Sequence, residues 1–267
     1  MSTVTAADDM APLVLQRHER GIAFLTLNRP AQYNALSEEM LAALEAAINQ
    51  VAGDSSVRVV VLAGAGKAFC AGHDLKQMKA HPSLEYYRRL FADCSRLMMR
   101  IQTLPQPVIA RVHGIATAAG CQLVGMCDLA VAADDARFAV SGINVGLFCA
   151  TPSVALSRNV GRKAAFEMLV TGELIDAPSA MQRGLINRCV PAADLDQEIS
   201  RLAAAIAAKP PSVIAAGKTL FYRQLELGVK AAYELAGEAM ACNMIDGTAQ
   251  EGVAAFIDKR PPRWDGD

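Results

Sequence analysis

Long apolar runs are missing from this sequence. No segment reaches the ~18 uninterrupted apolar residues that an ordinary membrane-spanning helix needs. The start of the chain lacks the apolar stretch of a signal peptide and the arginines of a transit peptide, and Asp8 and Asp9 precede any basic residue. We therefore expect no membrane partner, a cytoplasmic location and a flexible N-terminus over residues 1–11.

An excess of positive charge is also missing. The 26 Lys and Arg residues face 27 Asp and Glu residues, which gives a net charge of −1, and no basic run stands out. Binding a polyanion requires clustered Lys and Arg to displace counterions, so we expect no nucleic-acid partner. A single phosphorylated ligand needs only a local cationic patch, and the neutral balance does not exclude one.

Paired cysteines are absent as well. The seven cysteines are scattered, with no Cys-x-x-Cys pair and no neighbouring histidine at metal-ligand spacing. We therefore expect no metal site and a reducing compartment, in which free cysteines act as small hydrophobic residues. They are Cys70, Cys94, Cys121, Cys127, Cys149, Cys189 and Cys242.

Two common phosphate-binding loops do not fit the glycine-rich stretch that ends at Gly66. A P-loop requires Ser or Thr after Gly-Lys, but Lys67 is followed by Ala68. A dinucleotide fingerprint requires a third glycine where the chain has Phe69. The small residues nevertheless predict a loop whose backbone lies close to another segment or a ligand.

What the sequence does contain is an alternation of strand and helix patterns. Residues 13–27 read as a hairpin, Ser37 to Gly53 as a capped helix, and Val59–Leu62 as a buried strand. Strand patterns recur at Val108–Val112 and Leu129–Ala132. With 267 residues and 52% hydrophobic content, this predicts one large α/β domain, or a domain with a helical extension, built on a parallel or mixed sheet.

Helical patterns fill the rest of the chain. A long amphipathic helix is expected from Leu84 to Ile101, before Pro105 and Pro107. After Thr151-Pro152 the pattern becomes helical throughout, and alanine-rich segments favour helix over disorder. The expected helices there cover residues 163–171, 178–184, 195–208, 213–227, 229–244 and 248–257.

One stretch carries a family signature. Phe69-Cys70-Ala71-Gly72-His73-Asp74-Leu75 resembles the Phe-x-Ala-Gly-x-Asp-Leu/Ile signature of the crotonase superfamily, the enoyl-CoA hydratases and isomerases. Four further stretches recur in the family's order: Leu27–Pro30 with Asn34–Leu36, His113–Ala116 leading into Ala119–Cys121, Cys127–Ala132, and Phe256–Pro262. The run Asn144–Cys149 resembles a subgroup represented in animals by enoyl-CoA hydratase domain-containing protein three.

This resemblance implies an architecture and an assembly. It implies a crotonase (ClpP-like) fold of repeated ββα units, with a core domain over residues 12–205 and a C-terminal helical region over residues 206–267. In the family such helices trimerise the protein, and hexamers form from two trimers. We therefore expect a homotrimer or hexamer.

The resemblance also implies a site. Family members stabilise a thioester oxyanion or enolate with two backbone N–H groups, which by motif position are those of Ala71 and Ala119. The alternative is that both are only close-packed small residues. Hydratases place glutamates at two positions that here are Gln122 and Gly142, and neither side chain exchanges protons at neutral pH. The nearby Cys149 is either a nucleophile or an inert buried thiol.

Other motif positions imply contacts with coenzyme A as part of the substrate, with no permanently bound cofactor. His73 has either a chemical or a structural role, Asp74 reads as a residue that holds its loop together, and Lys259 binds CoA or ends a solvated helix. The substrate- or CoA-binding positions are Gln32, Tyr33, Gly72, His73, Asp74, Phe256 and Lys259.

Together these features predict an enzyme of the enoyl-CoA hydratase/isomerase family acting on acyl-CoA thioesters in fatty-acid or related metabolism. Because both glutamate positions have changed, we expect ordinary enoyl-CoA hydration to be weak. The alternatives are a thioester hydrolase, a decarboxylase, an isomerase or a non-catalytic acyl-CoA-binding protein.

Overall fold

The computed structural model describes residues 11–264, so the flexible N-terminus expected at 1–11 lies almost entirely outside the described residues. The strands fall into two sheets. A six-stranded sheet has the order β1-β2-β3-β5-β7-β10, and a four-stranded sheet has the order β4-β6-β8-β9. The strands are β1 (Val14–Glu19), β2 (Ile22–Leu27), β3 (Val59–Gly64), β4 (Ala68–Cys70), β5 (Val108–Val112), β6 (Ile115–Thr117), β7 (Leu129–Ala133), β8 (Arg137–Ala139), β9 (Ile175–Asp176) and β10 (Arg188–Val190).

The predicted hairpin and mixed sheet are confirmed. β1 pairs with β2 antiparallel, and β2, β3, β5, β7 and β10 follow in parallel. Three consecutive strand pairs, β3/β4, β5/β6 and β7/β8, each send one strand to the large sheet and the next to the small sheet. This repeat confirms the α/β crotonase-type architecture expected from the motifs.

The helices expected from the sequence are found within a few residues of their predicted ends, but α2, α4 and α5 lie outside the ranges predicted to be helical. Thr151-Pro152 reads as a break in the sequence, but proline is tolerated in the first turn of a helix, and α5 begins just before it. The helices are η1 (Pro30–Gln32), α1 (Glu38–Ala52), α2 (Leu75–Ala80), α3 (Leu84–Thr103), α4 (Ala119–Met126), η2 (Ser141–Val145), α5 (Ala150–Asn159), α6 (Arg162–Thr171), α7 (Ala177–Gln182), η3 (Ala192–Asp194), α8 (Leu195–Ala207), α9 (Pro211–Gln224), α10 (Val229–Met244) and α11 (Gly247–Ile257).

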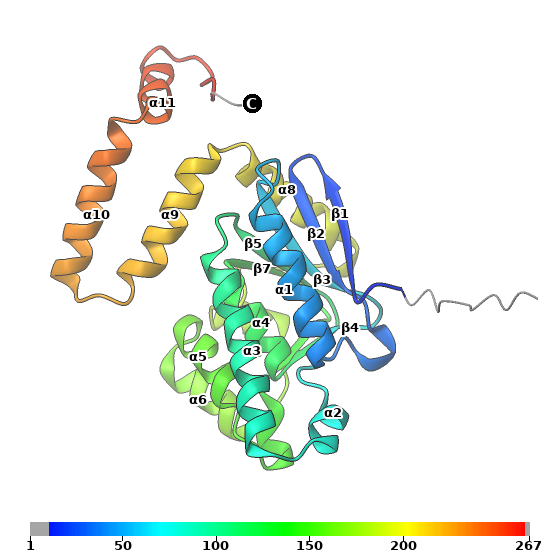
Figure 1. Ribbon diagram of the computed structural model, residues 1–267. Helices are drawn as coiled ribbons and strands as arrows, with labels where there is room; N and C mark the ends of the chain where they lie inside the picture. Colours follow the sequence, from blue (N-terminus) through cyan, green and yellow to red (C-terminus); the bar gives the residue numbers. More distant parts are fainter. Residues whose placement is uncertain (1–10, 265–267) are drawn as a thin grey trace, which may run out of the picture.

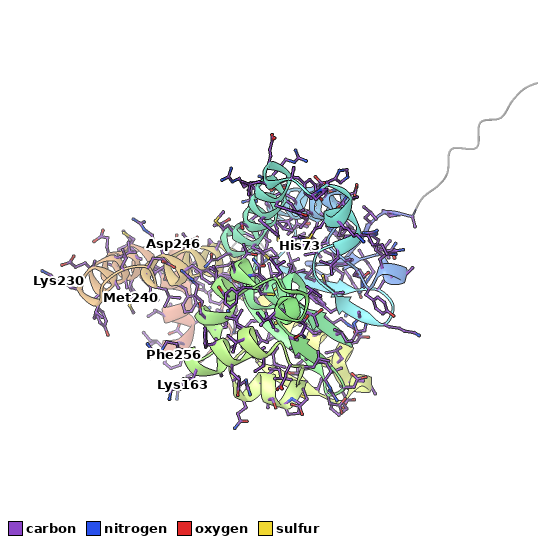
Figure 2. The ribbon with its side chains drawn as sticks, turned by 90° about the horizontal axis from the view of Figure 1, so that it is seen from below. His73, Lys163, Lys230, Met240, Asp246 and Phe256 are labelled. Atoms are coloured by element: carbon purple, nitrogen blue, oxygen red, sulfur yellow. The ribbon has the colours of Figure 1, made fainter. Side chains whose placement is uncertain are left out.

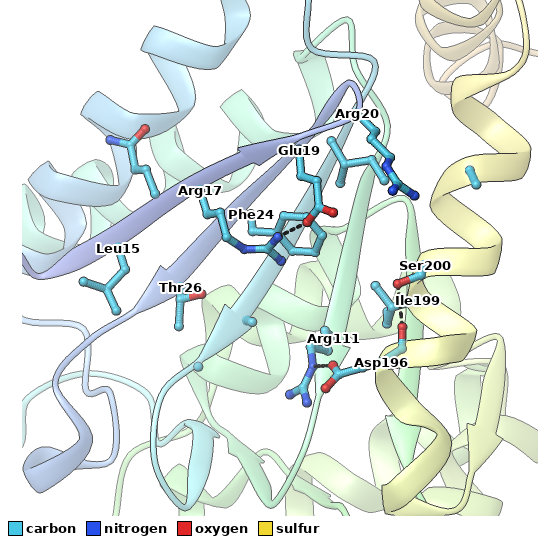
Figure 3. Close-up of a pocket in the computed structure, with 15 residues that line it drawn as sticks. Leu15, Arg17, Glu19, Arg20, Phe24, Thr26, Arg111, Asp196, Ile199 and Ser200 are labelled. Atoms are coloured by element: carbon cyan, nitrogen blue, oxygen red, sulfur yellow. Dashed lines mark hydrogen bonds and ion pairs between the residues drawn. The ribbon is translucent and has the colours of Figure 1, made fainter.

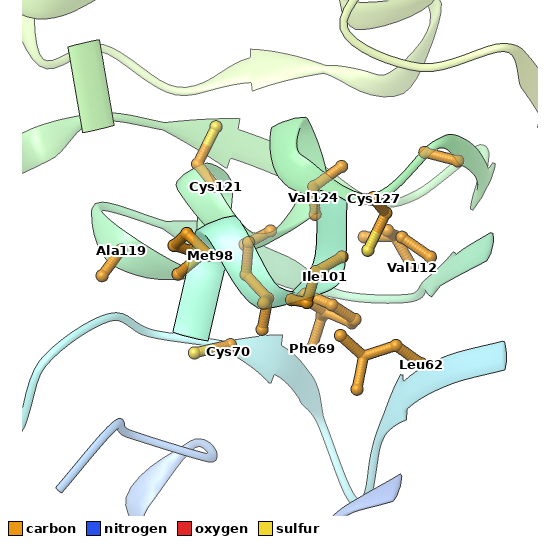
Figure 4. Close-up of a cluster of buried hydrophobic side chains, with 14 of the residues drawn as sticks. Leu62, Phe69, Cys70, Met98, Ile101, Val112, Ala119, Cys121, Val124 and Cys127 are labelled. Carbon is orange, nitrogen blue, oxygen red and sulfur yellow. The ribbon is translucent and has the colours of Figure 1, made fainter. Parts of the chain in front are cut away.

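The side chains of β3 point alternately to the two faces of the large sheet, and each face packs against its own hydrophobic core. Val60 and Leu62 face the main core under α1, α3 and α4, whereas Val59 and Val61 face a smaller core under α8. In the main core, Phe69 of β4 lies beside Ile101, while Cys70 lies on the side of Ala119 at the start of α4 (Figure 4). The loop after β4 and the start of α4 are therefore held against a packed interior.

The C-terminal helices α9, α10 and α11 project away from both sheets as an arm (Figure 1). A buried cluster fixes the root of this arm: the Lys218 Nζ donates to Asp128 at 2.6 Å and to the carbonyl oxygens of Ile101 and Gln106 at 3.0 and 3.1 Å. The Tyr222 hydroxyl donates to the other Asp128 oxygen at 2.8 Å. The boundary predicted between residues 205 and 206 stays a prediction.

None of the helices in the described part of the chain combines the length and apolar character needed to cross a bilayer.

Candidate active site

Three parallel strands of the small sheet end side by side, and their carboxyl ends build a pocket. β4 and β8 flank β6 in parallel, so the residues that follow them meet at one edge. Five of the predicted site residues line this pocket of about 340 Å³: Ala71, His73, Ala119, Gly142 and Cys149.

The pocket has apolar walls. Among residues 11–264, no Asp or Glu lines it. The side chains come from α2, α3, the end of η2 and the segment that joins η2 to α5. Several of them are exposed and form an apolar rim around the opening. Its larger apolar residues are Leu75, Met78, Phe91, Val145, Leu147 and Phe148.

The hydrogen bonding conflicts with the assignment of Ala71 as an N–H donor. The Ala71 N–H already donates to the Tyr33 carbonyl oxygen at 3.0 Å, and the Ala71 carbonyl accepts from the Thr117 hydroxyl at 3.1 Å. Ala71 therefore ties the loop to η1 and β6, and its amide is not directed at a ligand.

The backbone N–H of His73, two residues after Ala71, is available instead. His73 bridges to Leu36, whose N–H donates to the Gly72 carbonyl at 2.8 Å and whose carbonyl accepts from the Asp74 N–H at 3.3 Å. In a parallel bridge the N–H of the central residue points to the opposite side, away from its partner strand. The His73 N–H therefore faces away from Leu36, and no partner for it is found among the described residues.

Ala119 begins α4, where the first N–H groups of a helix have no partner within the helix. A Cβ on Gly72 would lie 3.1 Å from the Ala119 nitrogen, which places the loop before His73 directly against this amide. The preceding Ala118 has φ of 50°, a conformation that an L-residue adopts at an energetic cost. This strained residue lies at the turn from β6 into α4.

The surroundings of Gln122 and Gly142 differ. The Gln122 side chain is 6% exposed, and its Oε1 is buried without a hydrogen-bond partner in the described chain. At Gly142, a Cβ would lie 2.5 Å from the Leu147 carbonyl oxygen and 2.7 Å from the Cys149 Sγ. The segment that follows Gly142 has thus closed over the space that a side chain would take.

The two ionisable groups of the pocket are both uncharged at neutral pH. Burial raises the pKa of the Cys149 thiol, against the smaller effect of the Gly142 N–H that donates to its Sγ at 3.3 Å. Burial lowers the pKa of His73, against a smaller opposing effect of the Leu36 backbone. The thiol is therefore not activated as a nucleophile, and the imidazole is neutral.

Asn34, the first residue of the Asn34–Leu36 motif, is a positioning residue. It is fully buried, and its Nδ2 donates to the carbonyl oxygens of Ala65, Ala68 and Phe69 at 2.9, 2.8 and 3.2 Å. This amide fixes the loop that leads into β4. The asparagine itself was the signal for this role in the sequence, because a buried asparagine side chain can form hydrogen bonds with several backbone groups at once.

Asp74 has the structural role expected of it. Its carboxylate accepts from the Lys76 and Gln77 N–H groups at 3.1 and 3.2 Å, which caps α2, and pairs with Arg29 at 3.1 Å. Arg29 and Asp74 thereby join η1 to the loop that carries His73.

The predicted CoA-binding residues are split between two places. Gln32 and Tyr33 lie in and after η1, beside the pocket, since Tyr33 accepts from the Ala71 amide. Phe256 and Lys259 lie on and after α11, and Phe256 is 85% exposed on the arm, apart from His73 (Figure 2). Within one chain these two residues do not meet the pocket.

A second cavity, of about 850 Å³, lies between the outer face of β1–β3 and α8 (Figure 3). Five charged residues line it, and four of them pair with one another: Arg17 with Glu19, and Arg111 with Asp196 at 2.6 Å, while Arg20 is the fifth. It is larger than the first pocket, but it contains none of the predicted site residues. We therefore consider the smaller pocket the candidate active site.

No group of three or more His, Cys, Asp or Glu side chains capable of holding a metal ion occurs in residues 11–264.

Comparisons with known proteins agree with the fold and the motifs. The profile of the Enoyl-CoA hydratase/isomerase family matches residues 17–267. The chain is 47% identical to the mitochondrial enoyl-CoA hydratase domain-containing protein 3 of Xenopus laevis over 253 residues, 95% of this chain and 86% of that protein. The expected resemblance to this subgroup is confirmed.

Solved structures show the same likeness. A crystal structure of an enoyl-CoA hydratase from Mycobacterium smegmatis has a TM-score of 0.94 at 65% identity and covers 95% of this chain and 99% of its own. The crystal structure of human enoyl-CoA hydratase domain-containing protein 3 has a TM-score of 0.92 at 44% identity and covers 94% of this chain and 100% of its own. The chain belongs to the enoyl-CoA hydratase/isomerase family.

Proposed function

We propose that this chain is an acyl-CoA-transforming enzyme of fatty-acid or related acyl-CoA metabolism, which holds the thioester oxygen between the N–H groups of His73 and Ala119. The observation that carries the proposal is that both amides belong to the pocket, while the Ala71 amide is engaged elsewhere. Two fixed backbone donors suit an oxygen that gains negative charge, and removing one such donor typically costs ~3–4 kcal/mol of transition-state stabilisation.

The reaction differs from ordinary enoyl-CoA hydration. Hydration needs groups that activate water and deliver a proton, and each positioned acid or base contributes ~10²–10⁴-fold to the rate. The described pocket wall contains no carboxylate, and the positions that resemble those of the glutamates hold Gln122 and Gly142. Thioester hydrolysis, decarboxylation and isomerisation are the other reactions compatible with a charge-stabilising site.

Calorimetry and mass spectrometry test the proposal in two steps. Titration with acetoacetyl-CoA or octanoyl-CoA should give saturable heat, and the absence of heat and of competition at millimolar ligand would remove the site assignment. A panel of acyl-CoA thioesters followed by mass spectrometry should then show turnover of at least one member.

Crotonyl-CoA tests the hydration argument directly. We expect the wild-type protein to hydrate it poorly, and a normal hydratase rate would show that Gln122 and Gly142 do not disable the reaction. Gln122→Glu with Gly142→Glu supplies both carboxylates, but η2 must move, because the Cβ at residue 142 would meet the Leu147 carbonyl at 2.5 Å. Recovery should therefore be partial and limited to variants that fold, as judged by circular dichroism.

A second candidate is a non-catalytic acyl-CoA-binding protein. It is favoured by the protonated Cys149 thiol and by the lack of a carboxylate in the described pocket wall. The same panel separates the two functions: binding without turnover of any thioester supports the second, and turnover of one excludes it for that substrate.

We also propose that the chain self-associates as a trimer or hexamer through its arm. α9 and α10 contain no fully buried residue, and large apolar side chains stay exposed on all three arm helices. Phe256 and Lys259 would then reach the CoA of a neighbouring subunit. A monomer across micromolar concentrations in sedimentation would contradict this assembly. The cytoplasmic location stays a prediction.

A further inference from the structure

The tail after α11, residues 259–264, begins with a lysine in the left-handed conformation. The Arg260 N–H donates to the Ala255 carbonyl at 3.0 Å. The Lys259 N–H donates to the Phe256 carbonyl at 3.3 Å, which completes the hydrogen-bond pattern of a Schellman cap. Glycine is the usual residue at the left-handed position of this cap, but Lys259 occupies it with φ of 53°. A side chain held at this position despite the strain indicates that the side chain has a function.

One carboxylate fixes the tail. Glu251 accepts two hydrogen bonds from the Arg260 guanidinium, at 2.7 and 2.8 Å, and a third from the Arg263 N–H at 2.7 Å. The bonds from Arg260, with that from the Arg263 N–H, lower the pKa of the Glu251 carboxyl to about 2, so the group is ionised at neutral pH. A Cβ at Gly252 would lie 3.3 Å from the Trp264 ring, so the ring packs closely over this glycine. The carboxylate and its three hydrogen bonds, the Glu251 clamp, therefore hold the tail against α11.

The clamp leaves two cations of the tail unpaired. Arg260 is neutralised by Glu251 and also pairs with Asp258 at 3.5 Å. In the described part of the chain, neither Lys259 nor the Arg263 side chain forms an ion pair, and both residues are exposed. A hollow of about 620 Å³ opens between Arg263 and the clamp. Two exposed cations on a fixed backbone suit phosphate groups, which lysine binds as a point charge and arginine through its planar fork.

We propose that the tail directs Lys259 and Arg263 at the phosphates of a CoA molecule bound in the pocket of a neighbouring subunit. Glu251 and Arg260 are then positioning residues, and Arg263 is a CoA-binding residue in addition to those that the motifs imply. This inference rests on the proposed function and assembly, because the tail belongs to the arm, which projects away from both sheets of its own chain (Figure 1). The tail recognises the nucleotide end of the thioester, whatever acyl group the pocket holds.

Two thioesters with one acyl group test the tail. Acetoacetyl-CoA carries the nucleotide with its phosphates, whereas acetoacetyl-pantetheine has the same acyl and pantetheine parts and no phosphate. By calorimetry, with mass spectrometry to verify that each thioester stays intact, wild-type protein should bind acetoacetyl-CoA at least about tenfold more tightly. One charge-assisted hydrogen bond supplies a ratio of this size.

Variants assign the ratio to the tail. Glu251→Gln, Lys259→Met and Arg263→Met should each lower it by about two- to tenfold, because acetoacetyl-CoA binds more weakly while acetoacetyl-pantetheine binds as in wild type. The control is Lys230→Met, which removes another exposed lysine of the arm, 3.9 Å from the Glu234 carboxylate. This variant should keep the wild-type ratio.

Lys259→Gly separates a binding lysine from a merely structural one. Glycine adopts the left-handed conformation without strain, so this variant should melt at a higher temperature than wild type. It should nevertheless lose as much affinity for acetoacetyl-CoA as Lys259→Met does. If Lys259 only ended a solvated helix, the variant would be more stable and keep the wild-type ratio, and that result overturns the inference.

Equal binding of the two ligands to wild-type protein overturns the inference and leaves the proposed function standing, since the thioester is still bound. A ratio that survives in Glu251→Gln, Lys259→Met and Arg263→Met alike overturns it as well. Failure of both ligands to bind contradicts the proposed function itself, and the inference with it. If Glu251→Gln does not fold, as judged by circular dichroism, the variants of the two exposed cations decide.

Discussion

The close contact between Gly120 and β4 sets the spacing of the two proposed donors, and Gly120→Ala tests this. A Cβ at this position would lie 2.1 Å from the Cys70 carbonyl oxygen and 2.7 Å from its carbon. These are backbone atoms, so no side-chain rotation relieves the contact. Reaching an ordinary separation of ~3.5 Å requires α4 to move from β4 by roughly 1.4 Å.

Such overpacking costs typically about 1–3 kcal/mol, and contact with backbone places Gly120→Ala at the upper end. For a chain of this size each kcal/mol lowers the melting temperature by ~2–4 °C. The same movement draws the Ala119 amide away from the His73 amide. Loss of one hydrogen bond to the ligand should weaken acetoacetyl-CoA binding between about twofold and tenfold.

Gly53→Ala is the matched control. Gly53 ends α1 with φ of −87°, and a Cβ there would meet its nearest atom, the Gln50 carbonyl oxygen, at 3.8 Å. This change should leave binding intact and stabilise the protein slightly, because alanine restricts the unfolded chain. If Gly120→Ala melted at the wild-type temperature and bound acetoacetyl-CoA with wild-type affinity, the spacing argument would be refuted.

Three further outcomes are expected. Ala118→Gly should raise the free energy of unfolding by about 1 kcal/mol in urea titration, because it relieves the strained φ of 50°. Lys218→Met should lower it by about 3–5 kcal/mol, since it leaves a buried carboxylate unpaired, whereas Lys230→Met, at a side chain 91% exposed, should change it little. Burial alone would raise the pKa of the Asp74 carboxyl. Hydrogen bonds from the Gln77 N–H and Arg29 outweigh this effect and hold the pKa below its usual value. Its stabilising effect should be complete above pH ~4 and lost as the pH falls through the folded-state pKa, so Asp74→Asn should reduce the loss of melting temperature in acid.

Much of the fold could be predicted because its signals are local. The cap at Ser37, whose Oγ accepts from the Met40 N–H at 3.2 Å, and the apolar run of β3 follow from residue type and spacing alone. The short strands β4, β6 and β8 could not be found this way. Each has three residues, and its partner lies far along the chain.

The site was predictable only in part for a related reason. Motif position correctly brought His73, Ala119 and Cys149 to one pocket, because the parallel strands that carry them end at a common edge. The direction of each amide is a property of the backbone path and leaves no trace in residue type. That is why motif position pointed to Ala71, and why the closure of Leu147 over Gly142 was not foreseen.

The proposed use of main-chain amides also has an evolutionary consequence. A carboxylate at position 122 or 142 can disappear by a single nucleotide or codon change, but almost every substitution at His73 or Ala119 keeps the N–H, since only proline lacks it. Charge stabilisation can therefore outlast the proton-transfer groups in a lineage. A chain of this kind can exchange one acyl-CoA reaction for another by changing side chains around an inherited pair of amides.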